Sequence, residues 1–262
     1  MIHIGYFVVT LLSLKIVESA IEGNAVGGKK AVITEFPHSV YLGTTCYEED
    51  SEDSEDYNYW LCGASILNQK IVLTAAHCMY GCGPLSSFSV NMGNVDRNKG
   101  FESTVEAYIL HEDYTPRKTA NDIGVAMIKA TIKFKPNIKR IAIMKDPPYY
   151  EKSQMAGWGL IDEINSKYDS YLWYIDQYVW KNDECLQVLN KMPSGTVCAS
   201  SGNSESYSAR GDSGSALVVK NYIQIGIVSY KVPNLSRSLV VYTDTGYFYD
   251  WIKTNAKKLY CA

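Results

Sequence analysis

The sequence lacks the features that define several classes of protein. Its 262 residues carry a formal net charge of only −3, which gives no basic field for nucleic acid or an anionic membrane surface. After Leu14, no apolar run approaches the length of a membrane-spanning helix. Histidine is scarce, with four in the chain, and His38 and His111 lack the spacing of metal ligands. We therefore expect no nucleic-acid or membrane partner, no metal site and no cofactor.

The composition and the first residues indicate a secreted globular protein. Hydrophobic residues make up 46% of the chain, enough for a substantial core. The run Tyr6–Leu14 (YFVVTLLSL) is too short to span a bilayer but has the length of a signal-peptide core. Val17 and Ser19 follow at the spacing that a signal peptidase requires, which predicts a signal peptide over residues 1–19. A buried amino-terminal strand is the alternative.

An acidic segment interrupts the apolar runs of the first half. Glu48–Asp56 contains seven acids in nine residues, and such a run repels itself and favours a solvated loop. A calcium site or an exosite for a basic partner is the alternative, although the spacing does not match an EF-hand loop.

The segment Gly211-Asp212-Ser213-Gly214 is the strongest candidate for chemistry. It places Ser213 on a tight turn where little hinders the approach of a substrate carbonyl. A serine hydroxyl is weakly nucleophilic, so catalysis would need an imidazole base, a carboxylate that orients it and amide donors for the oxyanion. The amides of Gly211 and Ser213 could be those donors. An ordinary turn is the other interpretation of this motif.

Two further segments supply the missing groups. His77 lies in Thr74-Ala75-Ala76-His77-Cys78 and is the candidate base. Asp122 stands at the head of an apolar run, Ile123–Ile128, as a buried orienting group requires. The chain order is therefore histidine, aspartate, serine.

With these residues, the chain resembles the chymotrypsin-like (trypsin-type) serine endopeptidase family from Ala25 to its end. Further matching motifs are AVGG at 25–28, LCGASI at 61–66, MAGWG at 155–159, VVYT at 240–243 and FYDWI at 248–252. The resemblance implies an all-β fold of two antiparallel six-stranded barrels with the active-site cleft between them and a C-terminal helix. The implied bounds are a propeptide at 20–24 and a protease domain at 25–262, with barrels at about 35–135 and 140–246 and a helix at about 247–258.

The resemblance also assigns the cysteines. It implies disulfides between Cys62 and Cys78 and between Cys185 and Cys198. The family bridge beside the serine loop is absent, because Ala209 occupies one of its positions. Cys46 and Cys82 would lie in neighbouring loops, where they either pair or remain apart. Cys261 would then be free or would link to another chain; otherwise we expect a monomer.

The resemblance places unusual residues in the specificity pocket. Tyr207 takes the floor position where trypsin-like members carry aspartate, so cleavage after Lys or Arg is not expected. Ser229 and Lys231 belong to the pocket wall, and Lys231 and Val240 stand where the family has glycines. Together these side chains could fill the pocket. The alternative is a reshaped pocket with room for a small residue.

Activation departs from the family pattern as well. In the family, a cleaved zymogen inserts its new amino terminus, here Ala25, beside the aspartate that precedes the nucleophile, here Asp212. Asn24 replaces the usual Arg or Lys, so an ordinary trypsin-like activator is not expected to cut there. Ala25 replaces the usual isoleucine and would contribute roughly 1 to 2 kcal/mol less burial energy.

Two hypotheses follow. The pattern of a kept triad with an altered pocket resembles mite group 3 allergen-like proteases and the inactivated serine protease paralogues of the scabies mite, which act by binding, including to host complement proteins. We favour a secreted, extracellular protein of this kind, with weak or no proteolysis and host protein ligands. The alternative is an active endopeptidase of non-tryptic specificity, for example a digestive one, acting on proteins or peptides. Asn234 lies in a glycosylation sequon near the expected pocket, which distinguishes neither hypothesis.

Overall fold

The computed structural model describes residues 26–47 and 57–261. The predicted signal peptide (1–19), the propeptide (20–24), Ala25 and the acidic segment Glu48–Asp56 lie outside the described residues. The first of two antiparallel barrels is closed, and its strands follow the order β2 (Ser39–Cys46), β3 (Asn58–Ile66), β4 (Ile71–Thr74), β7 (Gly124–Ile128), β6 (Phe101–Leu110) and β5 (Ser87–Met92).

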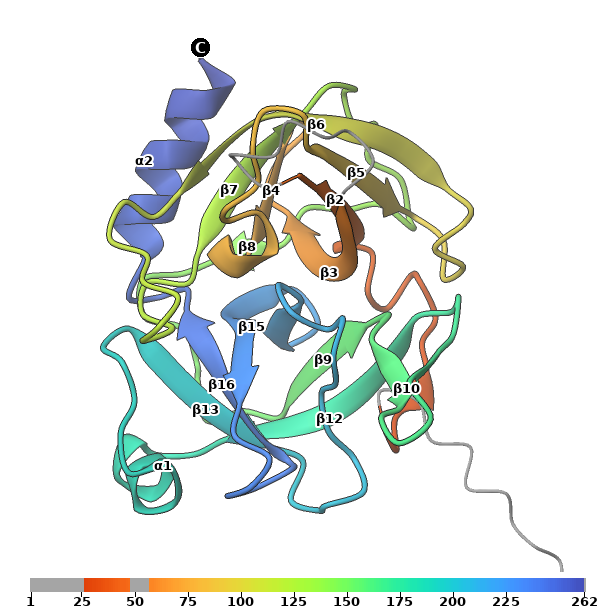
Figure 1. The fold of residues 1–262 in the computed structure, drawn as a ribbon. Coiled ribbons are helices and arrows are strands. Elements are labelled where there is room, and N and C mark those ends of the chain that lie inside the picture. The colour runs from red at the N-terminus through yellow and green to blue at the C-terminus, as the bar shows by residue number, and fades with distance from the viewer. Residues whose placement is uncertain (1–25, 48–56, 262) are drawn as a thin grey trace, which may run out of the picture.

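The second barrel lies below the first in Figure 1. It closes where β9 pairs with β12, and its order is β12 (Trp173–Val179), β13 (Thr196–Ser200), β16 (Leu239–Asp244), β15 (Ile223–Lys231), β14 (Ala216–Val219) and β9 (Ser153–Gly157). Short strands β1 (Lys29–Lys30) and β8 (Ala142–Ile143) extend this sheet, and β10 (Leu160–Asp162) pairs with β11 (Lys167–Tyr168) in a separate hairpin. The two six-stranded barrels confirm the expected fold class.

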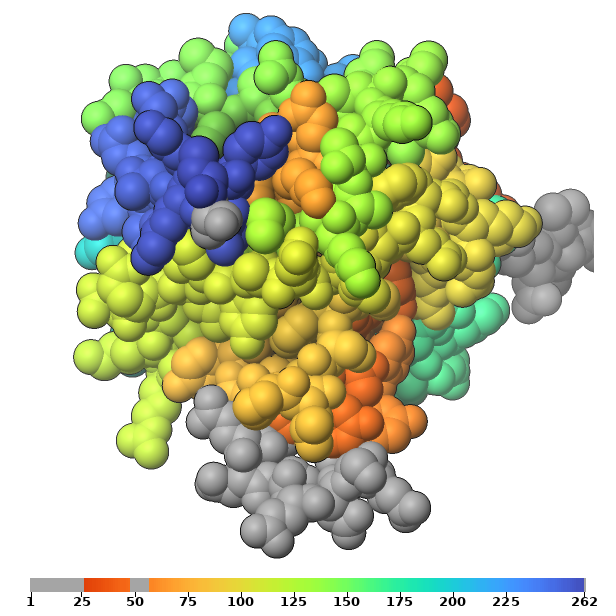
Figure 2. Space-filling view, turned by 90° about the horizontal axis from the view of Figure 1, so that it is seen from above, coloured from red at the N-terminus to blue at the C-terminus, as the bar shows by residue number. Residues whose placement is uncertain are grey.

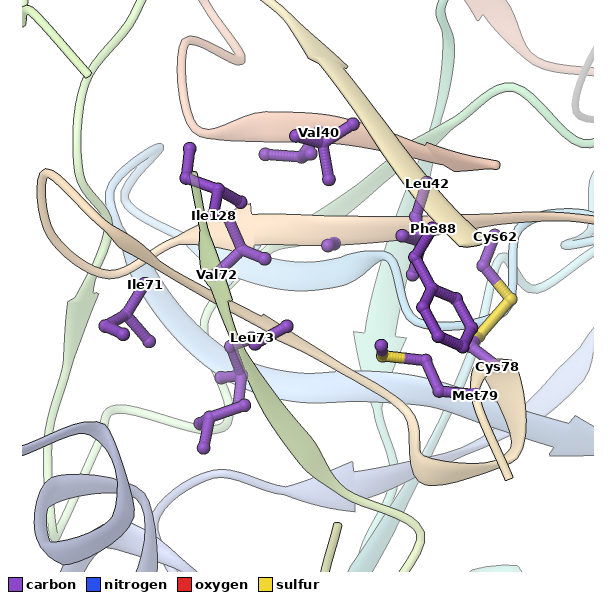
Figure 3. Packing of buried hydrophobic residues seen from close by; sticks show 14 of the residues in the cluster. Val40, Leu42, Cys62, Ile71, Val72, Leu73, Cys78, Met79, Phe88 and Ile128 are labelled. Carbon is purple, nitrogen blue, oxygen red and sulfur yellow. A yellow bond between two sulfur atoms is a disulfide. The ribbon is translucent and has the colours of Figure 1, made fainter. Parts of the chain in front are cut away.

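Apolar side chains from all strands fill the first barrel. In β4, the sequence IVLT is buried at every position, as expected for a strand covered on both faces. Figure 3 shows Val40, Leu42, Val72 and Ile128 pointing into one shared interior. The core therefore fixes β4 and β7, and two of the candidate catalytic residues lie next to these strands: His77 follows β4 and Asp122 precedes β7.

Two α-helices are described. The C-terminal helix α2 spans Tyr249–Tyr260 and buries Ile252 and Leu259, which lie on one face. It contacts β6 and β7 of the first barrel, and Figure 2 shows its blue surface beside the yellow-green part of the chain. It begins two residues later than expected because Asp244 Oδ1 accepts hydrogen bonds from the amides of Gly246 and Tyr247 and holds them in a turn.

The other helix, α1, spans Asn182–Leu189 and was not predicted from the sequence. It buries Cys185 and Leu189, one turn apart. No helix within residues 26–47 and 57–261 is long and apolar enough to span a membrane.

Three disulfides are present in the described chain. Cys62 bonds Cys78 and Cys185 bonds Cys198, both with Cα atoms 6.2 Å apart. Cys46 bonds Cys82, the pair that the sequence left open. Cys261 is exposed and forms no disulfide.

Candidate active site

Strand pairing brings His77 and Asp122 together. In the antiparallel pair β4–β7, Thr74 lies opposite Gly124. His77 follows Thr74 by three residues, in the short 3₁₀ turn Ala76–Cys78, and Asp122 precedes Gly124 by two. Both therefore stand at the same end of the pair. The His77 Nδ1–Asp122 Oδ2 distance is 2.8 Å, and the His77 backbone N–H donates to Asp122 Oδ1 at 2.9 Å.

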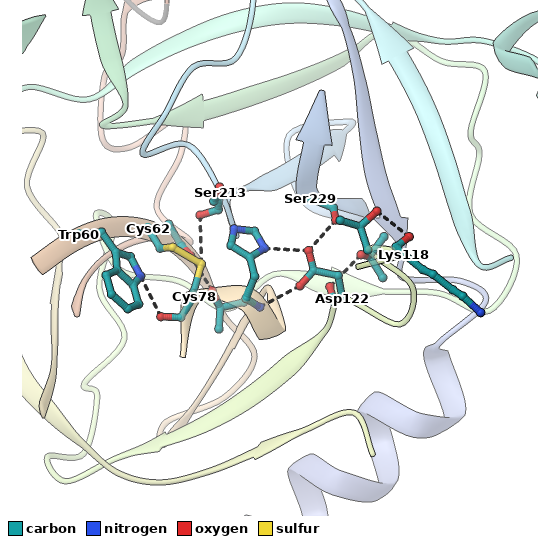
Figure 4. A network of polar contacts seen from close by, with 12 residues as sticks. Trp60, Cys62, Cys78, Lys118, Asp122, Ser213 and Ser229 are labelled. Atoms are coloured by element: carbon teal, nitrogen blue, oxygen red, sulfur yellow. Dashed lines mark hydrogen bonds and ion pairs between the residues drawn. A yellow bond between two sulfur atoms is a disulfide. The ribbon is translucent and has the colours of Figure 1, made fainter. Parts of the chain in front are cut away.

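The second barrel also holds Asp122. The Ser229 hydroxyl, in β15, donates to Asp122 Oδ2 at 2.5 Å, and the Thr243 hydroxyl, in β16, donates to the Asp122 carbonyl at 2.8 Å. Figure 4 shows Asp122 beside Ser229, with Ser213 on the other side of the imidazole that Asp122 contacts. Ser229 was expected in the pocket wall, and the structure gives it a further contact that fixes the carboxylate.

This arrangement sets the charge of both groups. Burial alone would lower the pKa of His77, but the adjacent Asp122 charge and hydrogen bond outweigh burial and raise it above its ordinary value. Burial would raise the pKa of Asp122, whereas His77 and Ser229 hold it below its ordinary value. Asp122 is thus a carboxylate that orients the ring and favours a proton on it.

Ser213 lies on a turn that only glycines can form easily. Gly211 and Gly214 have φ values of 101° and 82°, a backbone region that disfavours other residues. The turn is tied to the first barrel, because the Gly63 N–H donates to the Ser213 carbonyl at 2.7 Å. Ser213 and His77 line one hollow of about 510 Å³. Within the described chain, no hydrogen bond joins the Ser213 hydroxyl to the imidazole.

The backbone of the turn presents two free donors. The N–H groups of Asp212 and Gly214 donate to the carbonyls of Ala209 and Val228. Those of Gly211 and Ser213 donate to no acceptor in the part of the chain that the structure describes. Two unpaired amides, that of Ser213 itself and that of Gly211 two residues before it, could donate to an oxyanion, as the motif suggested.

Asp212 is fully buried below this turn. Its carboxylate accepts hydrogen bonds from the amides of Gly159 at 2.9 Å and Ala209 at 2.8 Å. Burial nevertheless raises the pKa of Asp212 to about 6. Nearby, the Val26 carbonyl accepts from the Tyr207 amide at 2.9 Å, so the chain directly after Ala25 is seated against the serine loop.

Lys231 links two of the other candidate pocket residues, Tyr207 and Val240. Tyr207 is 5% exposed and Val240 is 1% exposed. Lys231 lies opposite Val240 in the β15–β16 pair, and its ammonium group stands 4.4 Å from the centre of the Tyr207 ring. None of the three lines the hollow beside Ser213. Asn234 is exposed in the turn that joins β15 to β16.

Sequence reasoning missed the residue that fixes Lys231. The ammonium group donates to the Ser208 carbonyl at 3.0 Å and forms an ion pair with Glu163. Glu163 lies between β10 and β11, and an acid in a turn carries no signal of such a distant partner. An ion pair and a carbonyl acceptor together hold a lysine that would otherwise be costly to bury.

One cluster in the described chain has the residue types of a metal site. Cys62, His77 and Cys78 bring their ligand atoms within 4.8 Å of one another. The two sulfur atoms are bonded to each other, so neither is a thiolate that could bind a metal. The cluster therefore does not fit a metal.

Comparisons with known proteins agree with this geometry. The family model for trypsin matches residues 25–252. A chymotrypsin of Phaedon cochleariae is 28% identical over 241 residues, which cover 88% of this chain and 82% of that protein. The solved structure of a scabies mite inactivated protease paralogue matches with a TM-score of 0.73 and 26% identity, covering 87% of this chain and 95% of that one. A solved HL collagenase shares the fold, with a TM-score of 0.77, 24% identity and coverage of 88% and 98%.

Proposed function

The chain belongs to the trypsin family of serine proteases, and from this premise we propose that it is a secreted member that binds proteins and cleaves peptides weakly or not at all. Its catalytic groups are kept, and its specificity pocket is filled by its own side chains. The observation that carries the proposal is the position of Lys231, which lies over the Tyr207 ring and is paired with Glu163.

The catalytic steps that remain open to the protein follow from the site. The His77 ring, held at Nδ1 by Asp122, would take the proton of the Ser213 hydroxyl through Nε2 as Oγ attacks a carbonyl carbon. The free amides of Gly211 and Ser213 would donate to the resulting oxyanion. His77 would then give its proton to the leaving amine. Each of these groups lies in or beside the same hollow.

The filled pocket removes the binding that makes these steps fast. A substrate side chain in the pocket holds the scissile carbonyl against Ser213, and a misplacement of about 1 Å can cost roughly 100-fold in rate. Lys231 cannot leave easily, because its departure would separate an ion pair and expose the Tyr207 ring. Peptides would therefore bind without being held in register for attack.

The expected lack of proteolysis is supported by one neighbour in particular. The scabies mite paralogue that this chain resembles is itself described as an inactivated protease. We extend its lack of turnover to this chain and propose host proteins, complement components among them, as ligands. Binding of the mature protein to purified complement components, measured by surface plasmon resonance, tests that extension. No saturable binding to any of them would remove complement from the proposal.

Restoring small residues in the specificity pocket tests whether the pocket is filled. The mature form would carry Ala25→Ile, to remove weak activation as a cause, together with Tyr207→Ser, Lys231→Gly and Val240→Gly. Hydrolysis of a diverse peptide library is expected to rise by at least about 100-fold over the form with Ala25→Ile alone. The same variant with Ser213→Ala is the control for contaminating proteases. Ordinary protease rates in the unmodified mature protein would contradict the proposal.

One specific feature favours a second candidate, an active endopeptidase of non-tryptic specificity. The His77–Asp122 hydrogen bond and the two free amides are those of a competent site. If that candidate is correct, the unmodified mature protein cleaves library peptides at one residue type, and small or apolar residues fit best beside Tyr207 and Val240.

A further inference from the structure

The hollow beside Ser213 carries a charge that the proposed chemistry does not use. Among its lining residues, the permanently charged ones are Arg97 and Arg210, and none is an aspartate or glutamate. The chain contains only five arginines and is acidic overall. Two of the five arginines therefore line the hollow that contains Ser213, although the net charge of the protein is negative.

Arg97 is held in place by aromatic rings. Its guanidinium carbon lies 5.5 Å from the centre of the Tyr41 ring and 6.0 Å from that of Tyr168. Its backbone N–H donates to the Ser170 carbonyl at 2.9 Å, which fixes the loop that carries it. Stacking of this kind orients a guanidinium while leaving its N–H groups for another partner.

Among the described residues, the Arg97 guanidinium has no anionic partner. Its Nη1 atom is buried and makes no hydrogen bond in the described part of the chain. Neither Arg97 nor Arg210 forms an ion pair with a described carboxylate. A partly buried cation without a partner is costly, and an anionic ligand would remove that cost. Guanidinium groups bind carboxylates through two parallel hydrogen bonds.

The position of the hollow beside Ser213 indicates which part of a peptide ligand would occupy it. It shares Gly211 and Ser213 with the reaction site and none of the filled-pocket residues Tyr207, Lys231 and Val240. A peptide extends in two directions from its scissile bond, and the acyl side belongs to the filled pocket. The hollow is thus open to the leaving-group side.

The hollow also continues away from the serine. Tyr59 and Arg97 line a second hollow, of about 800 Å³, that extends over Ser89 of β5 and Ser103 of β6. The Tyr59 and Tyr41 hydroxyls lie 2.6 Å apart between the two. Several residues of an extended chain have room along this path, with Arg97 at the junction.

We propose that this surface binds peptide segments with an aspartate or glutamate side chain on the leaving-group side, and that Arg97 pairs with that carboxylate. Arg210, which is exposed beside Gly211, adds charge at the entrance. This inference rests on the proposed function, because it names the chemistry of the ligand at the same cleft. It does not require turnover.

The test compares labelled peptides that differ by one charge. The mature protein with Ser213→Ala is titrated with fluorescein-labelled octapeptides that carry Glu or Gln at one position and a C-terminal amide, and affinity is measured by anisotropy. The best Glu peptide is expected to bind at least about tenfold more tightly than its Gln partner. The preference should fall below about twofold in Arg97→Gln and persist in Arg140→Gln, a matched loss of one exposed arginine elsewhere.

Three outcomes would overturn the proposal. Equal binding of all Glu and Gln pairs would show that the hollow does not select carboxylates. A preference that survives Arg97→Gln would place recognition at another residue. Tighter binding of the Gln peptide when its C-terminal amide becomes a free acid, without a Glu preference, would identify a chain terminus as the ligand. If Arg97→Gln does not fold, the Glu and Gln comparison in the Ser213→Ala protein still decides. Peptide cleavage by the unmodified protein would contradict the filled pocket and leave this result standing.

Discussion

The ammonium group of Lys231 stands 4.4 Å from the centre of the Tyr207 ring. Glu163 and the Ser208 carbonyl complete the contacts of the ammonium group. The family resemblance places Lys231 on the wall and Tyr207 on the floor of the specificity pocket. We propose that this network of four residues, with Lys231 at its centre, closes the pocket.

If the volume of the Lys231 side chain closes the pocket, then removing its charge alone will not open the pocket. We expect Lys231→Met, which keeps the length of the side chain, to leave peptide hydrolysis unchanged. Lys231→Gly should raise it, by roughly tenfold, because only the smaller residue frees space. Glu163→Gln should have an intermediate effect, since it loosens the ion pair. Initial rates on one peptide library measure all three. A Lys231→Met variant as active as Lys231→Gly would show that charge, and not volume, blocks the site.

The His77–Asp122 pair predicts how reactivity depends on pH. Ser213 needs a neutral imidazole, and the pKa of His77 is raised, so the rate of labelling by a fluorophosphonate should rise with pH and reach half its maximum above pH of about 6.5. In Asp122→Asn the remaining effect on His77 is burial, which lowers its pKa, so the midpoint should move down. The maximal rate should fall by roughly 10⁴-fold because the ring loses its orientation. An unchanged midpoint in that variant would contradict the assignment.

The same pair contributes to stability in a defined pH range. The folded-state pKa of His77 is raised, so its contribution is fully present below the unfolded value of about 6.5 and is lost as pH rises through the folded value. Urea unfolding of the wild type and of His77→Gln across this range measures the difference. A difference that grows with pH would have the wrong sign.

The burial of Asp212 predicts how cleavage before Ala25 changes the stability of the protein. Burial raises the pKa of Asp212 to about 6, so its ionisation costs stability, which falls as pH rises from the unfolded pKa of about 3.9 to about 6 and stays lower above that pH. A free Ala25 amine inserted beside Asp212 would remove this cost. The mature form should therefore be more stable than the form with residues 20–24 attached between about pH 6 and 8. The difference should shrink as pH falls below about 6, because Asp212 then takes up a proton in the uncleaved form and its buried charge is removed. Equal stability at pH 7 would show that the amine does not insert.

The disulfides should carry a large share of the stability. Cys185 and Cys198 close a loop of 13 residues between α1 and β13. Replacing both with Ala should lower the free energy of unfolding by about 2 to 5 kcal/mol. Cys261→Ser is the control, because Cys261 is exposed and unbonded, and it should change the same quantity by less than about 0.5 kcal/mol. Comparable losses of unfolding free energy in both variants would show that the Cys185–Cys198 disulfide does not stabilise the protein.

Local motifs made the catalytic residues visible in the sequence. His77, Asp122 and Ser213 each lie in a short sequence motif. The residues of each motif form a single turn or the end of a single strand. The two-barrel fold could be predicted because these motifs together resemble those of one known family. The bounds of α2 were less accurate, because its start depends on the turn that Asp244 holds with its side chain.

Contacts between segments far apart in the chain could not be predicted from the sequence. Glu163 reaches Lys231 across 68 positions, and Ser229 reaches Asp122 across 107. The Arg97 guanidinium is oriented by the aromatic rings of Tyr41 and Tyr168, which belong to two different parts of the chain. Helix α1 has little apolar character, and its two buried residues depend on a disulfide and on β13 for their cover. Each of these features follows from packing, which residue patterns do not encode locally.

In the proposed function, catalytic groups that can still react stand beside a filled specificity pocket. The most direct measurement exposes the mature wild-type protein to a small fluorophosphonate that needs no pocket and, in parallel, to the peptide library. Mass spectrometry of the labelled protein should show one adduct, on Ser213, with none in Ser213→Ala, while the peptides remain uncut. Absence of the adduct in wild type would place the defect in the catalytic groups, and rapid peptide cleavage would show that the pocket is open.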